Sequence, residues 1–230
     1  MFKLLLIQTD VPKDMTALAA QPDGISLSFI DLAIKGGWIM IPILLLSVIA
    51  VYIFVDRYFA IKKAGKIDAS LLERVKVYIT GGKIDAALAL CKSTDNPASR
   101  MIEKGISRIG RPLTDVNAAI EIVGNLEIAK LEKGLPVLAS VAGGAPMLGF
   151  LGTVMGMIQA FYDMSNAGNN IDVTLLSAGI YQAMVTTVAG LIVGITAYFA
   201  YNILVSNVEK VVFKMEATTS EFMDLLNEPA

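Results

Sequence analysis

Two threonines, Thr153 and Thr187, lie deep inside long uncharged stretches of this 230-residue sequence. At membrane depth a threonine hydroxyl can line a polar wall for an ion, or it can bond a carbonyl one turn back in its own helix and do nothing else. Gln182 and Thr186, four residues apart, add a second polar stripe. Because a buried amide in lipid costs several kcal/mol without a hydrogen bond, Gln182 requires a partner or water. From the residues alone, an ion pathway and local packing both stay open.

Small residues surround these polar groups, several of them four positions apart. Such pairs let two membrane helices approach closely, and they are so common that helix packing is the first interpretation. Taken alone they specify no function. The residues that we assign to this packing are Pro146, Gly149, Gly152, Gly156, Gly190 and Gly194.

Titratable groups are missing where an ion path would need them. The long apolar stretches contain no Asp, Glu, Lys or Arg, and the sequence has no histidine. An ion path through a membrane usually requires at least one titratable or coordinating group. A proton path through this chain would therefore be incomplete, and a second subunit would have to supply the carboxylate.

The composition argues against several other functions. The single cysteine, Cys91, cannot form an internal disulfide, and we expect it to be a small buried side chain. Without histidine or a second cysteine we expect no metal site and no cofactor. No nucleotide-binding loop, catalytic triad or carboxylate pair is visible, so an enzyme is not expected. A formal net charge of −2 gives no reason to expect a nucleic-acid partner.

Hydrophobic residues make up 55% of the sequence and charged residues only 17%, with a mean hydropathy of +0.63. The apolar residues are gathered in the uncharged blocks 36–55, 134–162 and 173–208. At 1.5 Å per helical residue, each block is long enough to cross a hydrocarbon core about 30 Å thick. The sequence therefore predicts an all-α integral membrane protein with three transmembrane helices, of which the long second and third extend into a helical cytoplasmic domain.

Basic residues beside the spans predict the orientation. Arg57 follows the first span and Lys133 precedes the second, both with further lysines nearby, whereas the link after the second span has two acids and no base. Because loops rich in Lys and Arg stay in the cytoplasm, the amino terminus is predicted to be periplasmic and the carboxyl terminus cytoplasmic. The predicted segments are a periplasmic or interfacial segment 1–37, a first span 38–56, a cytoplasmic helical domain 57–134, a second span 135–162, a periplasmic loop 163–173, a third span 174–201 and a cytoplasmic carboxy-terminal helix 202–230.

The polar region 62–133 shows helical periodicity. Glycine and proline at 80–82, 96–97 and 110–112 divide it into three or four helices. The last of these, from Thr114 onward, is expected to run directly into the second span.

The amino-terminal segment carries two weaker patterns. Residues 1–7 resemble the start of a signal peptide, but the apolar run is short and no cleavage pattern follows, so we do not expect a cleaved signal. Residues 28–34 could form a short amphipathic helix in the membrane interface or extend the first span, and the two alternatives are equally supported.

Longer motifs carry a resemblance to a known family. Residues 131–139, LEKGLPVLA, and 145–158, APMLGFLGTVMGMI, resemble the second-span signature of the MotA/TolQ/ExbB proton channel family. Residues 182–195, QAMVTTVAGLIVGI, resemble its third. Three spans with an outside amino terminus favour the ExbB and TolQ branch over flagellar stator subunits, which usually have four.

The resemblance implies a function in the bacterial inner membrane. In this family several copies form a ring, typically a pentamer, whose second and third helices surround the single-span helices of an ExbD or TolR subunit. An aspartate on that partner carries the proton. The resemblance would place Thr153 and Thr187 on the pore wall opposite this aspartate. An ExbB would then energise TonB and outer-membrane uptake, whereas a TolQ would energise TolA and envelope constriction.

One position departs from the family pattern. Members often have a glutamate where this chain has Gln182, and an amide cannot titrate. We therefore expect the partner aspartate to carry the ion, with proton favoured over sodium. The expected partners are further copies of this chain, the single-span subunit, a TonB-like protein and membrane lipids. A non-conducting scaffold, in which the glycines and threonines only pack helices, is the alternative from another class.

Overall fold

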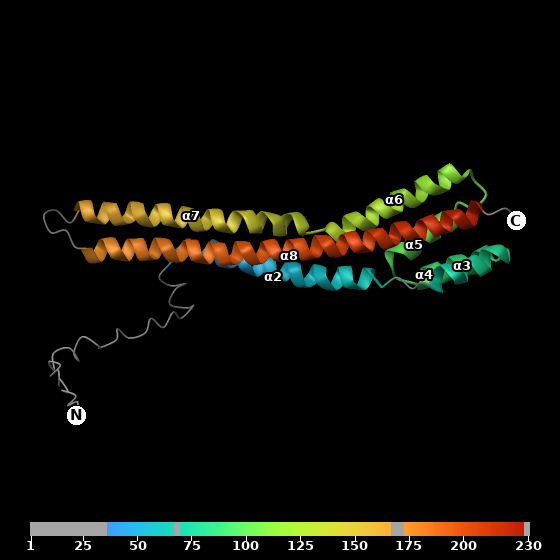
Figure 1. Cartoon of the computed structure of the whole chain (residues 1–230), viewed down its shortest axis with the longest axis horizontal. Coiled ribbons are helices and arrows are strands. Elements are labelled where there is room, and N and C mark those ends of the chain that lie inside the picture. Colours follow the sequence, from blue (N-terminus) through green and yellow to red (C-terminus); the bar gives the residue numbers. More distant parts are fainter. Residues whose placement is uncertain (1–35, 67–69, 167–172, 228–230) are drawn as a thin grey trace, which may run out of the picture.

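Three long apolar helices make up most of the described residues in the computed structural model (Figure 1). The helices α2 (Met40–Ala64), α7 (Leu135–Asn166) and α8 (Val173–Asn227) are each long and apolar enough to cross a membrane. In the figure α7 and α8 lie side by side in opposite directions, and α2 lies along α8. The predicted all-α architecture with three membrane-spanning helices is confirmed.

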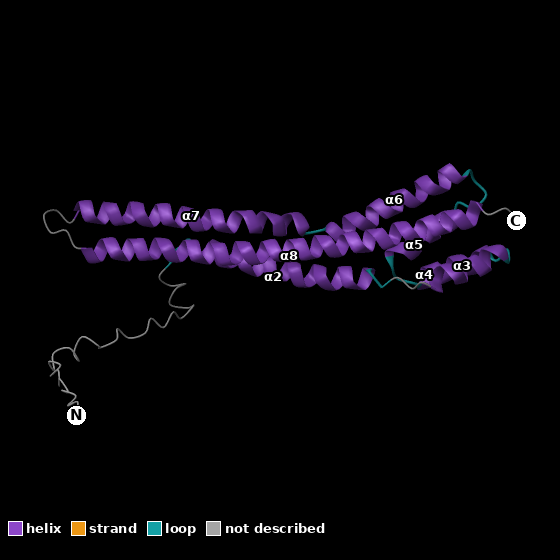
Figure 2. Cartoon of the chain, viewed as in Figure 1, coloured by secondary structure: helices purple, strands orange, loops and turns teal. Residues whose placement is uncertain are grey.

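The structure describes residues 36–66, 70–166 and 173–227. Within these ranges it contains helices and loops and no strand (Figure 2). The amino-terminal patterns predicted at 1–7 and 28–34 lie outside the described residues.

Four shorter helices gather at the end of the molecule where α8 terminates (Figure 1). The turns between them contain Gly82 and Gly110, whose φ angles of 69° and 93° lie in the region that only glycine adopts freely. The helix breaks predicted at 80–82 and 110–112 are therefore confirmed. The four helices are α3 (Ser70–Thr80), α4 (Ile84–Ser93), α5 (Pro97–Ile106) and α6 (Leu113–Glu132).

The third predicted break, at 96–97, starts α5 with a capping box. The Asn96 side chain accepts a hydrogen bond of 2.7 Å from the Ser99 backbone N–H, which would otherwise lack a partner in the first turn. The Ser99 hydroxyl in turn accepts from the Asn96 N–H at 3.4 Å. Pro97 follows at the first helical position, where the missing N–H costs nothing.

The junction between α6 and α7 differs from the prediction. Instead of running directly into the second span, α6 ends at Glu132, and Lys133 has an extended ψ of 123°. Gly134 follows with φ 88°, and the helix restarts with a hydrogen bond of 3.1 Å from the Leu138 N–H to the Gly134 carbonyl. The expectation of one continuous helix is wrong because a glycine with positive φ reorients the chain here.

The helix α8 connects the membrane part to the helical domain. Its 55 residues correspond to about 82 Å at 1.5 Å per residue, far more than the roughly 30 Å of the hydrocarbon core. Its last turns carry Phe222, which is fully buried in the core of the helical domain. A Cβ atom at Gly105 would lie 2.6 Å from the Phe222 ring, so α5 and α8 meet at a position that requires glycine.

The single cysteine belongs to this core. Cys91 is 1% exposed, which confirms the prediction of a buried side chain. Burial, assisted by the negative charge of Glu103, raises the pKa of its thiol to about 11. The thiolate needed for reaction is therefore scarce at neutral pH.

Candidate functional site

The second and third spans approach so closely that their backbones touch. A Cβ atom at Gly190 would lie 2.5 Å from the Ala145 carbonyl oxygen and 2.9 Å from the Gly149 Cα. A Cβ at Gly149 would lie 3.0 Å from the Thr186 carbonyl oxygen. Because real Cβ atoms essentially never come within 3.0 Å of such an atom, a side chain at Gly190 would force α7 and α8 to shift, and one at Gly149 would make a contact tighter than nine in ten real Cβ contacts.

The close contact continues from this crossing toward the carboxyl end of α7. Gly152 lies against the Thr186 side chain, and a Cβ at Gly156 would lie 3.0 Å from that of Ala183. Gly179, which the sequence reading left out, lies against Ala160 one turn further. Its spacing of four from Ala183 is the signal that could have identified it.

Pro146 lies inside α7 and also contacts α8. A proline has no N–H to give to the carbonyl four residues earlier, which is that of Ala142. Gly194 lies against the Pro146 ring, and a Cβ at this glycine would lie 3.0 Å from the Ala142 oxygen. The absence of a side chain at 194 thus leaves room for the proline ring and for the freed carbonyl.

The two threonines of the predicted pore wall are joined through one carbonyl. The Thr187 hydroxyl donates a hydrogen bond of 3.0 Å across the interface to the Gly149 carbonyl oxygen. In a regular helix that oxygen also pairs with the backbone N–H of Thr153, four residues on. The Thr153 hydroxyl itself donates to the Phe150 carbonyl at 2.6 Å. Both side chains are half-buried, so each keeps part of its surface free for another molecule.

Thr186 and Gln182 occupy different surroundings. Thr186 is 1% exposed, and its hydroxyl donates to the Ala183 carbonyl at 2.7 Å. It therefore packs between α7 and α8 and is covered. Gln182 is half-buried, and its side-chain nitrogen lies against Gly37, just before the start of α2. The structure places Thr186 and Thr187 on the side of α8 that contacts α7, and Thr153 lies on α7 one turn after Gly149, whereas Gln182 reaches toward the first span.

The chemistry available along this interface is limited to hydroxyls and carbonyls. These groups can solvate a cation or donate to an anion, but they cannot hold a proton at physiological pH. The nearest acid on α7 is Asp163 at the end of the span, where it accepts a hydrogen bond of 2.9 Å from Gln159. Among the described residues, the interface thus offers hydroxyl and carbonyl groups that can form a polar wall.

A second cluster, of charged side chains, lies where the helical domain meets the carboxyl end of α2. Glu127 on α6 is only 4% exposed, and its carboxylate accepts hydrogen bonds from Arg100 at 2.6 Å and from Lys130 at 2.7 Å. Arg100 also bonds Asp95 at 2.8 Å, and Asp95 bonds Lys63 near the end of α2 at 2.8 Å. The cluster thereby ties α2, α5 and α6 together.

Burial and hydrogen bonding act in opposite directions on Glu127. Desolvation by burial raises its pKa, but the hydrogen bonds and positive charges of Arg100 and Lys130 outweigh it, so the pKa lies below its ordinary value. The carboxylate is therefore ionised at neutral pH. The Arg100 Nε is buried, and among the described residues it has no hydrogen-bond partner.

Comparison with known proteins identifies relatives of this chain. A sequence model of the MotA/TolQ/ExbB proton channel family matches residues 93–217. A putative biopolymer transport protein, ExbB-like 1, of Synechocystis is 29% identical over 187 residues, which are 77% of this chain and 70% of that protein. The TolQ protein of the Tol-Pal system of Haemophilus influenzae is 29% identical over 184 residues, 77% of this chain and 75% of that protein.

A third relative is matched over a smaller share of its own length. The putative biopolymer transport protein ExbB homolog of Methanothermobacter thermautotrophicus is 27% identical over 176 residues, which are 75% of this chain but 62% of that protein. The chain thus spans less than two thirds of this relative. The matched residues 93–217 include α7 with its glycines and the part of α8 that carries Thr187 and Gly190. Because they make up more than half of the sequence, the chain belongs to the MotA/TolQ/ExbB proton channel family.

Proposed function

We propose that this chain is the ring-forming subunit of a proton-driven motor in the bacterial inner membrane. Several copies, most simply a pentamer, surround the single transmembrane helices of an ExbD-like or TolR-like partner. The ring couples the proton-motive force to TonB-dependent transport across the outer membrane. Its amino terminus is periplasmic and its carboxyl terminus cytoplasmic.

The hydrogen bond from Thr187 to the Gly149 carbonyl carries this proposal. It sets a hydroxyl on the contact between two spans whose backbones touch, at a depth where the sequence has no charge. The Gly149 carbonyl satisfies this hydroxyl in the single chain, and a hydroxyl on the contact between two spans can turn toward a charge that enters there, which supports a role in solvating that charge. Thr153, one turn from Gly149, extends the same strip along α7.

In the proposed mechanism the partner's aspartate moves along this strip. When ionised, the carboxylate accepts hydrogen bonds from the Thr153 and Thr187 hydroxyls, which turn their single O–H groups toward it from the Phe150 and Gly149 carbonyls. When a proton arrives down the gradient, the carboxyl becomes neutral, its attraction to the wall weakens, and the partner helix can shift or rotate. The work is then passed to the periplasmic side through the partner.

Large apolar side chains on the free surfaces of α7 and α8 support assembly into a ring. Met147, Phe150 and Met184 are 73%, 67% and 64% exposed in the single chain. In a membrane these surfaces face either lipid or a neighbouring copy, and the ring covers part of them. Gln182 lies against Gly37, and because its amide cannot titrate we assign it no proton.

A TolQ-type subunit energising envelope constriction is the second candidate, since relatives of both names match at 29% identity. Affinity purification of the tagged chain from its native membranes distinguishes the two. Recovery of a single-span protein with a membrane aspartate together with a TonB-like protein supports the first assignment, and recovery of a TolA-like protein supports the second. If the chain purifies alone from intact membranes at every detergent tested, the motor assignment fails and a scaffold is favoured.

A further inference from the structure

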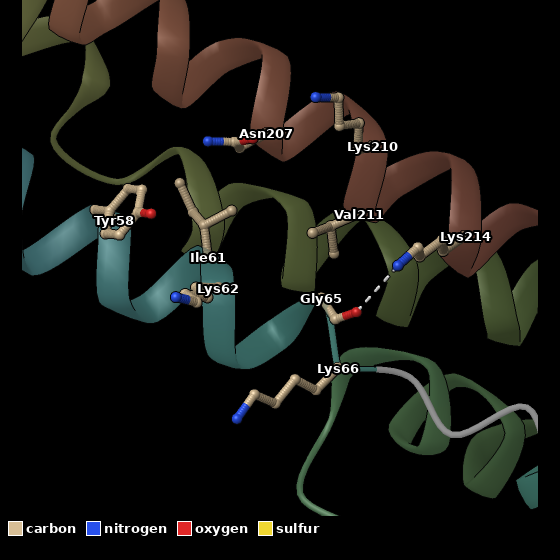
Figure 3. Close-up of a pocket in the computed structure, with 9 residues that line it drawn as sticks. All are labelled: Tyr58, Ile61, Lys62, Gly65, Lys66, Asn207, Lys210, Val211 and Lys214. Carbon is tan, nitrogen blue, oxygen red and sulfur yellow. Dashed lines mark hydrogen bonds between the residues drawn. The ribbon is translucent and has the colours of Figure 1, made fainter.

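A basic cavity of about 330 Å³ opens between α2 and α8, just beyond the end of the first apolar span (Figure 3). Four lysines line it, one from α2, one from the chain just after α2 and two from α8, together with a tyrosine and an asparagine. In the figure Lys214 reaches from α8 toward Gly65, whereas the Lys210 amine lies on the side of α8 away from α2 and Lys66 extends away from α8. The polar lining residues are Tyr58, Lys62, Lys66, Asn207, Lys210 and Lys214.

The lysines of this cavity have no carboxylate partner among the described residues. Lys214 donates to the Gly65 carbonyl at 3.3 Å, and Lys62 lies 5.8 Å from the centre of the Tyr58 ring. Lys63, by contrast, which points elsewhere, is paired with Asp95 at 2.8 Å. Positive charges gathered without counter-charges repel one another, so the cavity is suited to an anion.

The same two helices form an apolar cavity of about 300 Å³ further into the membrane. Its α2 residues Ser47, Val51 and Phe54 continue at helical spacing into Tyr58 and Ile61 of the basic cavity. On α8 the lining likewise runs at helical spacing from 193 to 214. The two cavities therefore lie along one groove, apolar in the span and basic beyond it.

The dimensions of the groove match one lipid molecule. The centres of the two lining segments on α2 are about 11 residues apart, or about 16 Å along a helix. This is close to half of the roughly 30 Å hydrocarbon core, which is the depth of one leaflet. The uncharged stretch of the first span ends at Val55, so the lysines begin where lipid headgroups lie.

We propose that the α2–α8 groove binds an anionic phospholipid of the adjacent leaflet. Its phosphate lies among Lys62, Lys210 and Lys214, with the Tyr58 hydroxyl and the Asn207 amide as hydrogen-bond donors. One acyl chain occupies the apolar part, against Val51 and Ala200. A free phosphate has the same charge chemistry but makes no use of the apolar half of the groove, which is why we assign the site to a lipid.

The test measures lipid retention by native mass spectrometry on the full chain, purified with whatever subunits accompany it. The purified protein is titrated with phosphatidylglycerol, with phosphatidylcholine of the same acyl chains, and with inorganic phosphate. The variant K62Q/K210Q/K214Q removes the phosphate contacts. The control K83Q/K92Q/K133Q removes the same charge from exposed lysines outside the groove, one of them, Lys133, just before the second span.

Each basic side chain near an anionic lipid strengthens association by about fivefold, so losing three should weaken phosphatidylglycerol binding by about a hundredfold. The control should bind it like the wild type, and phosphatidylcholine should bind weakly to all three proteins. Equal retention by the two triple variants overturns the proposal.

A second variant, Ala200→Phe, fills the apolar half of the groove and leaves the lysines in place. It should also lose the lipid. Retention of phosphatidylglycerol by Ala200→Phe, or its displacement by inorganic phosphate, means that the groove holds an anion without an acyl chain and overturns the assignment to a lipid.

Discussion

Replacing Thr187 by valine removes one hydroxyl and almost no volume. In the structure this hydroxyl donates to the Gly149 carbonyl at 3.0 Å and thereby joins the second span to the third. The Gly149 oxygen is not left unpaired in the variant, because in a regular helix it retains the Thr153 backbone N–H. We expect Thr187→Val to lower the stability of the α7–α8 pair by only about 0.5–1 kcal/mol.

The expected effect on ion movement is larger than the effect on stability. If the hydroxyl donates to the ionised aspartate of the partner, it contributes about 1.5–3 kcal/mol, the usual value for a hydrogen bond to a charged group. Its loss should slow proton flux by about 10- to 150-fold, since 1.36 kcal/mol corresponds to a factor of ten. The ring should remain assembled.

Thr196→Val is the matched control on the same helix. Its hydroxyl donates to the Ile192 carbonyl at 2.7 Å, one turn back in α8, and makes no bond to α7. Flux is measured with a pH-sensitive dye inside vesicles that contain the chain and its copurified single-span partner, and assembly is measured by size-exclusion chromatography. Thr196→Val should conduct like the wild type. Wild-type flux in Thr187→Val would refute the pore-wall assignment, and dissociation of its ring would show that Thr187 acts in packing.

Three other predictions concern packing, charge and reactivity. Gly190→Ala places a Cβ 2.5 Å from the Ala145 carbonyl oxygen and should lower the free energy of unfolding by about 1–3 kcal/mol, seen as a lower unfolding temperature in detergent. The control Gly143→Ala, whose Cβ would meet nothing within 4 Å, should not destabilise the protein. Equal effects of the two variants would contradict the close contact of α7 with α8. Arg100→Met leaves the buried Glu127 carboxylate with Lys130 alone and should lower the free energy of unfolding by about 2–4 kcal/mol at pH 7. Because the pKa of Glu127 is lowered in the folded protein, the stability that its pairing provides is present above the ordinary pKa of about 4.5 and is lost as pH falls through the folded value. The difference in free energy of unfolding between wild type and Arg100→Met should therefore shrink in acid. A difference that stays constant with pH would argue against the pairing. Cys91, buried and with its pKa raised to about 11, should resist maleimide at neutral pH until the protein is unfolded, and rapid labelling of the folded protein would contradict its burial.

The three spans could be predicted because an uncharged stretch of 20 residues or more has few alternatives to crossing a membrane. The turns of the helical domain were equally accessible, since Gly82, Gly110 and the Asn96–Pro97 pair are strong local signals. The break before α7 was missed although its signal is present. Gly134, two residues before Pro136, marks a helix end followed by a new first turn.

Contacts between residues far apart in the chain could not be predicted from the sequence. Arg100 lies 27 positions before Glu127, and nothing local shows that packing of α5 on α6 pairs them. Gln182 and Thr186 share a helical face by spacing, yet one meets Gly37 and the other Gly152, because α8 packs against two helices at once. The basic groove likewise combines lysines that are 148 positions apart, Lys62 and Lys210, and each of them alone reads as an ordinary flank of a span.

The central claim is that this chain supplies the wall of a proton path and a partner supplies the titrating group. Proton flux into vesicles under an imposed pH gradient and membrane potential tests it most directly. Three preparations are compared: the chain alone, the chain with its single-span partner, and the chain with a partner whose membrane aspartate is replaced by asparagine. We expect flux only in the second. Flux through the chain alone, or undiminished flux with the asparagine partner, would contradict the account.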